Sequence, residues 1–140
     1  MTYQEWFEAH AAKHAVIVNR LTHLSNLELV EYFRFENMVV NEPDFCLLYT
    51  ENKKCHEMEH LNCYWCACPY FRFNDSGLSQ QKDKILYSMC AIESKDGTQF
   101  VSDVSIHQDC THCLIPHKEK VIKKEFNRNW RITMEEAPCK

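Results

Sequence analysis

The chain has 140 residues, of which 45% are hydrophobic and 26% are charged, and its formal net charge is −4. This length corresponds to about one domain, and the composition can build an ordinary core, so a second large domain and a disordered chain are excluded. Net negative charge is not typical of proteins that coat nucleic acid or bind membranes through basic surfaces. The longest apolar run, residues 63–68, has six residues, whereas a membrane-spanning helix needs about 20.

The N-terminus and the cysteine content together indicate a cellular compartment. Residues 1–5 show no basic patch, no apolar signal core and no small-residue cleavage site, so we expect a cytoplasmic protein. Thiols stay reduced in the cytosol, where dense cysteines usually hold metal. The chain has nine cysteines, and an odd number also argues against a fully paired disulfide framework.

Residues 1–36 predict a helical hairpin. Thr2-x-x-Glu5 and Ser25-x-x-Glu28 are capping boxes, in which a hydroxyl and a carboxylate bond the free amide groups of a first helical turn. The second helix is expected to end at about Glu36. Spacings of three and four place one set of side chains on a single face of the first helix. This set consists of Phe7, His10, His14, Ile17, Leu21 and Leu24.

His10 and His14 stand four residues apart on that apolar face. Such a pair could bind a metal ion together. Their apolar neighbours favour the other interpretation, in which both histidines are partly buried and hydrogen-bonded.

The rest of the chain predicts loops, a β-hairpin and a last helix. Five cysteines fall within residues 46–68, where the helical pattern is absent. Residues 84–93 and 98–107 alternate in polarity on either side of Asp96-Gly97, a strong hairpin signal. Pro116 suits the first turn of the last helix. We therefore predict a small single α+β domain, with an N-terminal helical extension (1–36) joined compactly to a cysteine-rich metal-binding domain (37–140).

Two blocks, Cys63-x-x-Cys66-x-Cys68 and Cys110-x-x-Cys113-x-x-x-His117, concentrate candidate metal ligands. A Cys-x-x-Cys spacing lets two thiolates converge at about 2.3 Å from one ion. The blocks flank the predicted hairpin, and the second begins a helix, so their order is that of a treble-clef zinc module. The remaining thiols can form a second site, with His117 and with His56 or His107 as nitrogen donors. The candidate ligands are Cys46, Cys55, Cys63, Cys66, Cys68, Cys90, Cys110, Cys113 and His117.

Other interpretations of the cysteines stay open. Free cysteine is among the most buried residue types, so Cys46 and Cys90 could be small core residues, and structural disulfides are a further alternative. Cys139 is expected to lie outside the ligand set.

The blocks Asn62–Tyr70 and Asp109–Lys118, with Lys54-Cys55-His56 upstream, resemble the cysteine-rich small domain family, described as probable metal-binding domains of bacteria and archaea. The resemblance covers about residues 46–118, and Cys46, Cys90 and His117 would match the early, middle and last ligand positions. The stretch between Cys68 and Cys110 is longer here, and residues 1–36 lie outside the resemblance. The resemblance implies metal binding and no particular reaction.

Zinc is the metal that the element order and the histidine donor favour. The alternative is a 4Fe-4S cluster, because closely spaced thiolates here have aromatic neighbours that could shield a cluster. We expect one or two zinc ions in a structural or partner-docking accessory module, and the alternative is an iron-sulfur protein for electron transfer or redox sensing. The aromatic neighbours are Tyr64, Trp65, Tyr70, Phe71 and Phe73.

His56-Glu57-Met58-Glu59-His60 matches the H-E-x-x-H motif of zinc hydrolases. That motif needs a helix, which we do not expect between Cys55 and Cys63, so the hydrolase hypothesis is the weakest and no catalytic residue is assigned. Residues 118–131 carry six basic and two acidic side chains. A solvated amphipathic helix explains this weak basic segment, so we expect no membrane or nucleic-acid partner, while a protein partner stays open.

Overall fold

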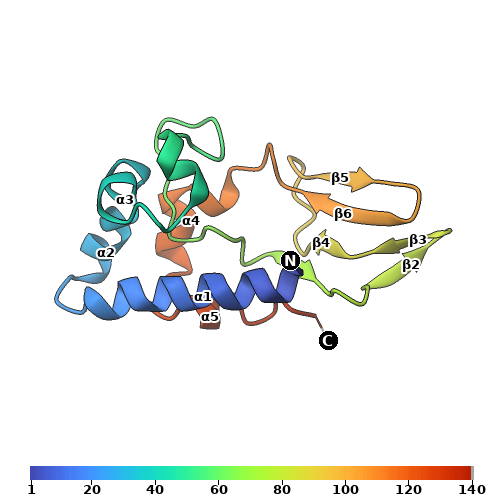
Figure 1. The fold of residues 1–140 in the computed structure, drawn as a ribbon, viewed down its shortest axis with the longest axis horizontal. Helices are drawn as coiled ribbons and strands as arrows, with labels where there is room; N and C mark the ends of the chain where they lie inside the picture. Colours follow the sequence, from blue (N-terminus) through green and yellow to red (C-terminus); the bar gives the residue numbers. More distant parts are fainter. Residues whose placement is uncertain (140) are drawn as a thin grey trace.

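Figure 1 shows the fold in a computed structural model, which describes residues 1–139. Lys140, the last residue of the predicted cysteine-rich domain, lies outside the described residues. The α-helices are α1 (Tyr3–Arg20), α2 (Asn26–Tyr32), α3 (Phe35–Asn41), α4 (Glu119–Lys124) and α5 (Trp130–Thr133). Two 3-10 helices are η1 (Leu47–Glu51) and η2 (Ile115–His117).

The strands form two small sheets, of which one is antiparallel and the other is mixed. The strands are β1 (Phe71–Phe73), β2 (Ser79–Gln81), β3 (Lys84–Leu86), β4 (Ser88–Cys90), β5 (Thr98–Val101) and β6 (Ser105–Asp109). One sheet pairs β1 with β4, and the other has the order β2-β3-β6-β5. The sheets occupy one end of the molecule, α2 and α3 occupy the other, and α1 begins beside the sheet region and runs towards α2 (Figure 1). The chain is therefore α+β, as predicted.

Both predicted capping boxes are confirmed. The Glu5 amide donates to Thr2 Oγ1 at 3.1 Å, and the Thr2 amide donates to the Glu5 carboxylate at 2.8 Å. The Ser25 and Glu28 pair forms the same two bonds at the start of α2. Local hydrogen bonding therefore contributes to both helix starts.

The predicted end of the second helix is wrong. α2 ends at Tyr32, and α3 continues helical structure to Asn41, beyond the expected end at Glu36. Arg34 between them is extended, because the Cys63 amide donates to the Phe33 carbonyl oxygen at 2.8 Å and the Phe35 amide donates to that of Leu61 at 3.0 Å. A distant segment thus interrupts the helix at its midpoint.

The predicted hairpin across Asp96-Gly97 is also wrong. Residues 84–93 form two strands in different sheets, since β3 runs parallel to β6 while β4 runs antiparallel to β1. A Cβ at position 97 would lie 2.6 Å from the side-chain nitrogen of Gln108, so a larger residue there would require the Gln108 side chain to move.

The observed hairpin is β5–β6, and a serine closes its turn. The Ser102 hydroxyl accepts hydrogen bonds from the amides of Val104 and Ser105 at 3.3 and 3.0 Å. Serine hydroxyls bond nearby amides in this way in tight turns. The turn between β5 and β6 therefore forms without a glycine.

The last predicted helix is shorter than expected and starts later. Pro116 lies in η2, and α4 begins at Glu119. Glu119 accepts hydrogen bonds from the Arg34 guanidinium at 2.6 and 3.1 Å, which joins α4 to the corner between α2 and α3.

The hydrophobic core lies mainly in the helical part and contains part of the cysteine-rich segment. Tyr64 and Trp65 are fully buried beside Phe33 and Leu29. Because these two aromatic residues stand between Cys63 and Cys66, core packing fixes the position of the Cys63-x-x-Cys66 turn.

Candidate metal centre

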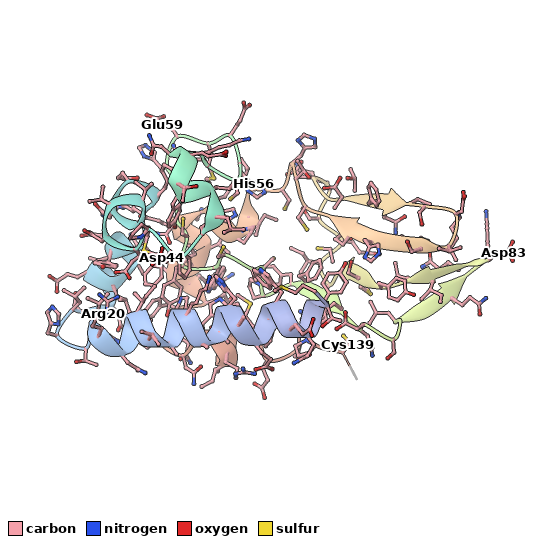
Figure 2. The ribbon with its side chains drawn as sticks, viewed as in Figure 1. Arg20, Asp44, His56, Glu59, Asp83 and Cys139 are labelled. Carbon is pink, nitrogen blue, oxygen red and sulfur yellow. The ribbon has the colours of Figure 1, made fainter. Side chains whose placement is uncertain are left out.

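Three donor atoms converge where the helical part meets the sheets. The Cys55 sulfur lies 3.1 Å from His56 Nδ1 and 3.6 Å from His117 Nε2. All three atoms lie within 4.8 Å of one another, and no other group of three Cys, His, Asp or Glu side chains in residues 1–139 meets this condition. Figure 2 shows His56 at this junction, in contrast to Asp83 at the far tip of the sheet. The cluster could hold a metal ion.

Backbone carbonyl oxygens determine which nitrogen of each imidazole carries the proton. The Cys110 carbonyl oxygen lies 3.0 Å from His56 Nε2, and the Asn62 carbonyl oxygen lies 2.9 Å from His117 Nδ1. A carbonyl oxygen only accepts hydrogen bonds, so these two nitrogens are the donors. In the neutral rings, His56 Nδ1 and His117 Nε2 therefore present lone pairs to the Cys55 sulfur.

The protonation of this cluster favours a cation. Burial lowers the pKa of His117 to about 4, so its imidazole is neutral near pH 7. The single thiol proton of Cys55 can satisfy only one of the two imidazole lone pairs. A metal ion satisfies all three donors, and metal-bound histidines commonly donate their other N–H group to a backbone carbonyl, as both do here.

Three further thiols lie around Cys55 and make up, with it, the first thiol group (Cys46, Cys55, Cys63 and Cys66). Burial raises the pKa of Cys63 to about 12, and the thiols of Cys55 and Cys46 add to this effect. Burial also raises the pKa of Cys66 well above its usual value, again with contributions from the other three. These thiols stay protonated near pH 7 unless a cation displaces their protons.

Tyr49, in η1, places a hydroxyl beside this group. Tyr49 is only 6% exposed, and its hydroxyl makes no hydrogen bond of regular geometry in the described part of the chain, its nearest polar interaction being with the neutral Cys63 thiol. Burial raises its pKa, and the thiols of Cys63, Cys66 and Cys46 raise it further, so it remains a protonated donor. A buried donor without a partner is costly, and a neighbouring thiolate would supply the missing acceptor.

The second thiol group consists of Cys68, Cys90, Cys110 and Cys113. Burial raises the pKa of Cys68 to about 12 and that of Cys110 to about 11, and the other thiols of the group contribute in the same direction. All four residues line a small cavity of about 20 Å³. No three sulfurs of either thiol group lie within 4.8 Å of one another in the described chain, so each group would have to contract to hold an ion with bonds of about 2.3 Å.

The two Cys-x-x-Cys pairs have different neighbours, whereas in a treble clef they would lie together. Cys63 and Cys66 belong to the first thiol group, whereas Cys110 and Cys113 belong to the second. The separation follows from packing, because Cys63 is buried in the helical part whereas Cys68 precedes β1, which pairs with the strand that ends at Cys90.

Other candidate side chains have separate environments. His107, considered as a nitrogen donor, lies 2.6 Å from the Tyr3 hydroxyl instead of joining the cluster. The Cys139 thiol lies 3.8 Å from the carbonyl oxygen of Glu136. His56–His60 forms no helix, and the side chain of His60 is 85% exposed, so the two histidines of the H-E-x-x-H match do not form its metal site.

His10 and His14 are both buried in the core, but the expected hydrogen bond is found only for His14. His14 Nε2 donates to the Tyr64 carbonyl oxygen at 3.0 Å, whereas His10 Nε2 has no partner among residues 1–139. His10 stacks on Trp6 with ring centroids 4.9 Å apart, and His14 stacks on Phe33 at the same distance. Their role in this structure is aromatic packing.

Sequence reasoning did not identify Tyr49 as part of the candidate centre. Its place three residues after Cys46 in η1 carries no recognisable motif, so only the structure brings it to the thiols.

Comparison with known protein families, with curated proteins and with solved structures gives no match. The resemblance to the cysteine-rich small domain family therefore stays a prediction. Across the described residues, no helix combines the length and the apolar character needed to cross a membrane.

Proposed function

We propose that this protein is a small zinc-binding module, in which clustered cysteine and histidine side chains hold one or two ions. The observation that carries the proposal is the convergence of Cys55 Sγ, His56 Nδ1 and His117 Nε2 within 4.8 Å. Two backbone carbonyl oxygens orient the imidazoles so that both lone pairs meet the thiol. Sulfur and imidazole nitrogen are the donors that zinc prefers.

The second thiol group supports a second zinc site. Four thiolates without an open position are typical of structural zinc, and Cys68, Cys90, Cys110 and Cys113 all line one small cavity. All nine cysteines are free thiols, which agrees with a reducing compartment such as the cytoplasm. Membership of the cysteine-rich small domain family would fit these properties.

The ions would act on folding and thereby on partner docking. A structural zinc site contributes on the order of 10–16 kcal/mol of apparent binding free energy, comparable with or larger than the net stability of a domain, about 5–15 kcal/mol. The first thiol group joins η1 to the Cys63-x-x-Cys66 turn, and the second joins β4 to the segment after β6. Zinc would therefore hold both parts in the arrangement that a partner protein recognises.

Matched histidine and cysteine variants test this proposal. We expect His56→Gln and Cys55→Ser to lower zinc content or weaken zinc affinity at least tenfold, because each removes a donor. His60→Gln and Cys139→Ser are the controls, since His60 is exposed and Cys139 lies outside both thiol groups, and zinc content should not change. Zinc is measured by mass spectrometry and by competition with a chromogenic chelator. Equal zinc binding in all four variants would reject the site, and equal loss in His56→Gln and His60→Gln would favour the hydrolase motif.

A further inference from the structure

A large cavity lies between the start of α1 and the sheet of β3 and β6. Its volume is about 1020 Å³, and its walls include the aromatic side chains of Tyr3, Trp6, Phe71 and Tyr87. Ligand pockets of about 300–1,000 Å³ with mostly apolar walls and a few polar groups bind small molecules. The space is therefore large enough for a planar ligand of one or two fused rings.

A chain of hydrogen bonds ends at the wall of this cavity. The Gln108 amide donates to Ser88 Oγ at 2.7 Å, Ser88 Oγ lies 3.0 Å from the Tyr3 hydroxyl, and that hydroxyl lies 2.6 Å from His107 Nδ1. Ser88 is only 1% exposed, and its other partner is a donor, so its proton must go to the Tyr3 oxygen. Tyr3 then donates to His107 Nδ1.

This direction leaves His107 with its proton on Nε2. Nε2 makes no hydrogen bond to any residue in the described chain, and His107 lines the cavity. Its ring is held by stacking on Tyr87, with centroids 5.2 Å apart and planes 15° apart. His107 thus contributes to these aromatic walls an N–H donor that has no acceptor in the described chain.

Charge restricts what this donor can bind. No lysine or arginine of the described chain lines the cavity, whereas the Asp75 carboxylate does. Asp75 accepts from the amides of Tyr3 and Gln4, both at 2.9 Å, so it closes the start of α1 and is not available as an acceptor for His107. An anion would meet no lysine or arginine here and would face the Asp75 carboxylate, while Met1, His56 and His117 line another part of the cavity.

We propose that this cavity binds an uncharged planar heteroaromatic molecule, whose carbonyl oxygen or ring nitrogen accepts the hydrogen bond from His107 Nε2. Trp6, Phe71 and Tyr87 cover the faces of its rings. The contacts proposed here do not use the metal ligands, although His56, His117, Cys66, Cys68 and Cys110 line the same cavity.

The test uses three probes on the full chain as purified, with its metal content measured in every sample. Isoquinolin-1(2H)-one offers a carbonyl oxygen, naphthalene has nearly the same shape without an acceptor, and 1-naphthoate adds a charge. We expect isoquinolinone to bind most tightly and to shift the His107 Nε2–H signal in the NMR spectrum of ¹⁵N-histidine-labelled protein. His107→Phe keeps a ring for stacking, and should weaken isoquinolinone binding about 3- to 10-fold while leaving naphthalene binding within about twofold. His60→Gln is the matched control and should bind all probes as the unchanged protein does.

Three results would overturn the proposal. These are no binding of any probe at about 1 mM, tighter binding of naphthoate than of isoquinolinone, and an unshifted His107 signal in the saturated complex. The NMR measurement needs no substitution, so it decides the matter even where His107→Phe fails to fold. Because zinc content is recorded separately, failure of this site and failure of the zinc proposal are distinguishable.

Discussion

Replacing Tyr49 with phenylalanine should have opposite effects on the metal-free and the zinc-bound protein. In the metal-free chain the buried hydroxyl has only a weak contact with the neutral Cys63 thiol, so its removal should raise the free energy of unfolding by about 1 kcal/mol, the low end of the cost of an unsatisfied buried polar group. In the zinc-bound chain the hydroxyl can donate to a thiolate of the first thiol group. Loss of a hydrogen bond to a charged acceptor should cost about 1.5–3 kcal/mol.

Thermodynamic linkage then predicts weaker zinc binding by the variant. The two effects add to at least about 2.5 kcal/mol, which corresponds to an increase of about 60-fold in the zinc dissociation constant. Chelator competition measures the affinity, and urea unfolding with and without chelator measures both stabilities. A variant that binds zinc within twofold of the unchanged protein, or that is less stable without metal, would refute this account of Tyr49.

Three more predictions follow from the packing. Burial lowers the pKa of His10 to about 4 and of His14 to about 3, so the unfolded chain takes up protons near pH 6.5 before the folded chain does. Stability should therefore fall as the pH drops from about 6.5 to 4, and His10→Phe should flatten this dependence by about one proton in urea unfolding with chelator present; an unchanged slope would contradict the assignment. Asn62→Ala removes hydrogen bonds to Val30, Tyr64 and Glu119 and should lower the free energy of unfolding by about 2–4 kcal/mol, whereas exposed Asn37→Ala should cost less than about 1 kcal/mol. Chelation should abolish amide protection in residues 46–83 while α1 and α2 keep most of theirs, and unchanged exchange in 46–83 would reject a folding role for the metal.

Features of the fold that depend on neighbouring residues could be predicted from the sequence. The two capping boxes need only residues three apart, and both appear where they were expected. The burial of His10 and His14 follows from the spacing of one helix face. The expectation of no helix at the H-E-x-x-H match rested on nearby cysteines, and His56–His60 is indeed not helical.

Features that depend on distant pairing could not be predicted. The break at Arg34 requires the 61–63 segment to bond with Phe33 and Phe35, and nothing in the local pattern shows that contact. The pairing of β3 in parallel with β6 was missed for the same reason. A parallel pair leaves no turn signature between its strands.

In the candidate centre, too, the sequence indicated which residue types could be ligands, but it did not show which of them lie together in space. Spacing alone identified the cysteines and His117, and a Cys-His neighbour suggested His56. Spacing left the grouping of these ligands open, and in the structure Cys63, Cys46 and Cys55 are the thiols that raise the pKa of Cys66. The burial of the aromatic residues between Cys63 and Cys66 determines that grouping, and this packing is not visible in the spacing.

Metal analysis with an absorption spectrum, on protein purified without oxygen, tests the central claim most directly. We expect a colourless protein that carries one or two zinc ions per chain, held at the site around Cys55, His56 and His117 and at the second thiol group. A protein without metal would contradict the claim. So would a brown protein with a broad band near about 400 nm and about four irons per cluster, which would assign the thiols to an iron-sulfur centre.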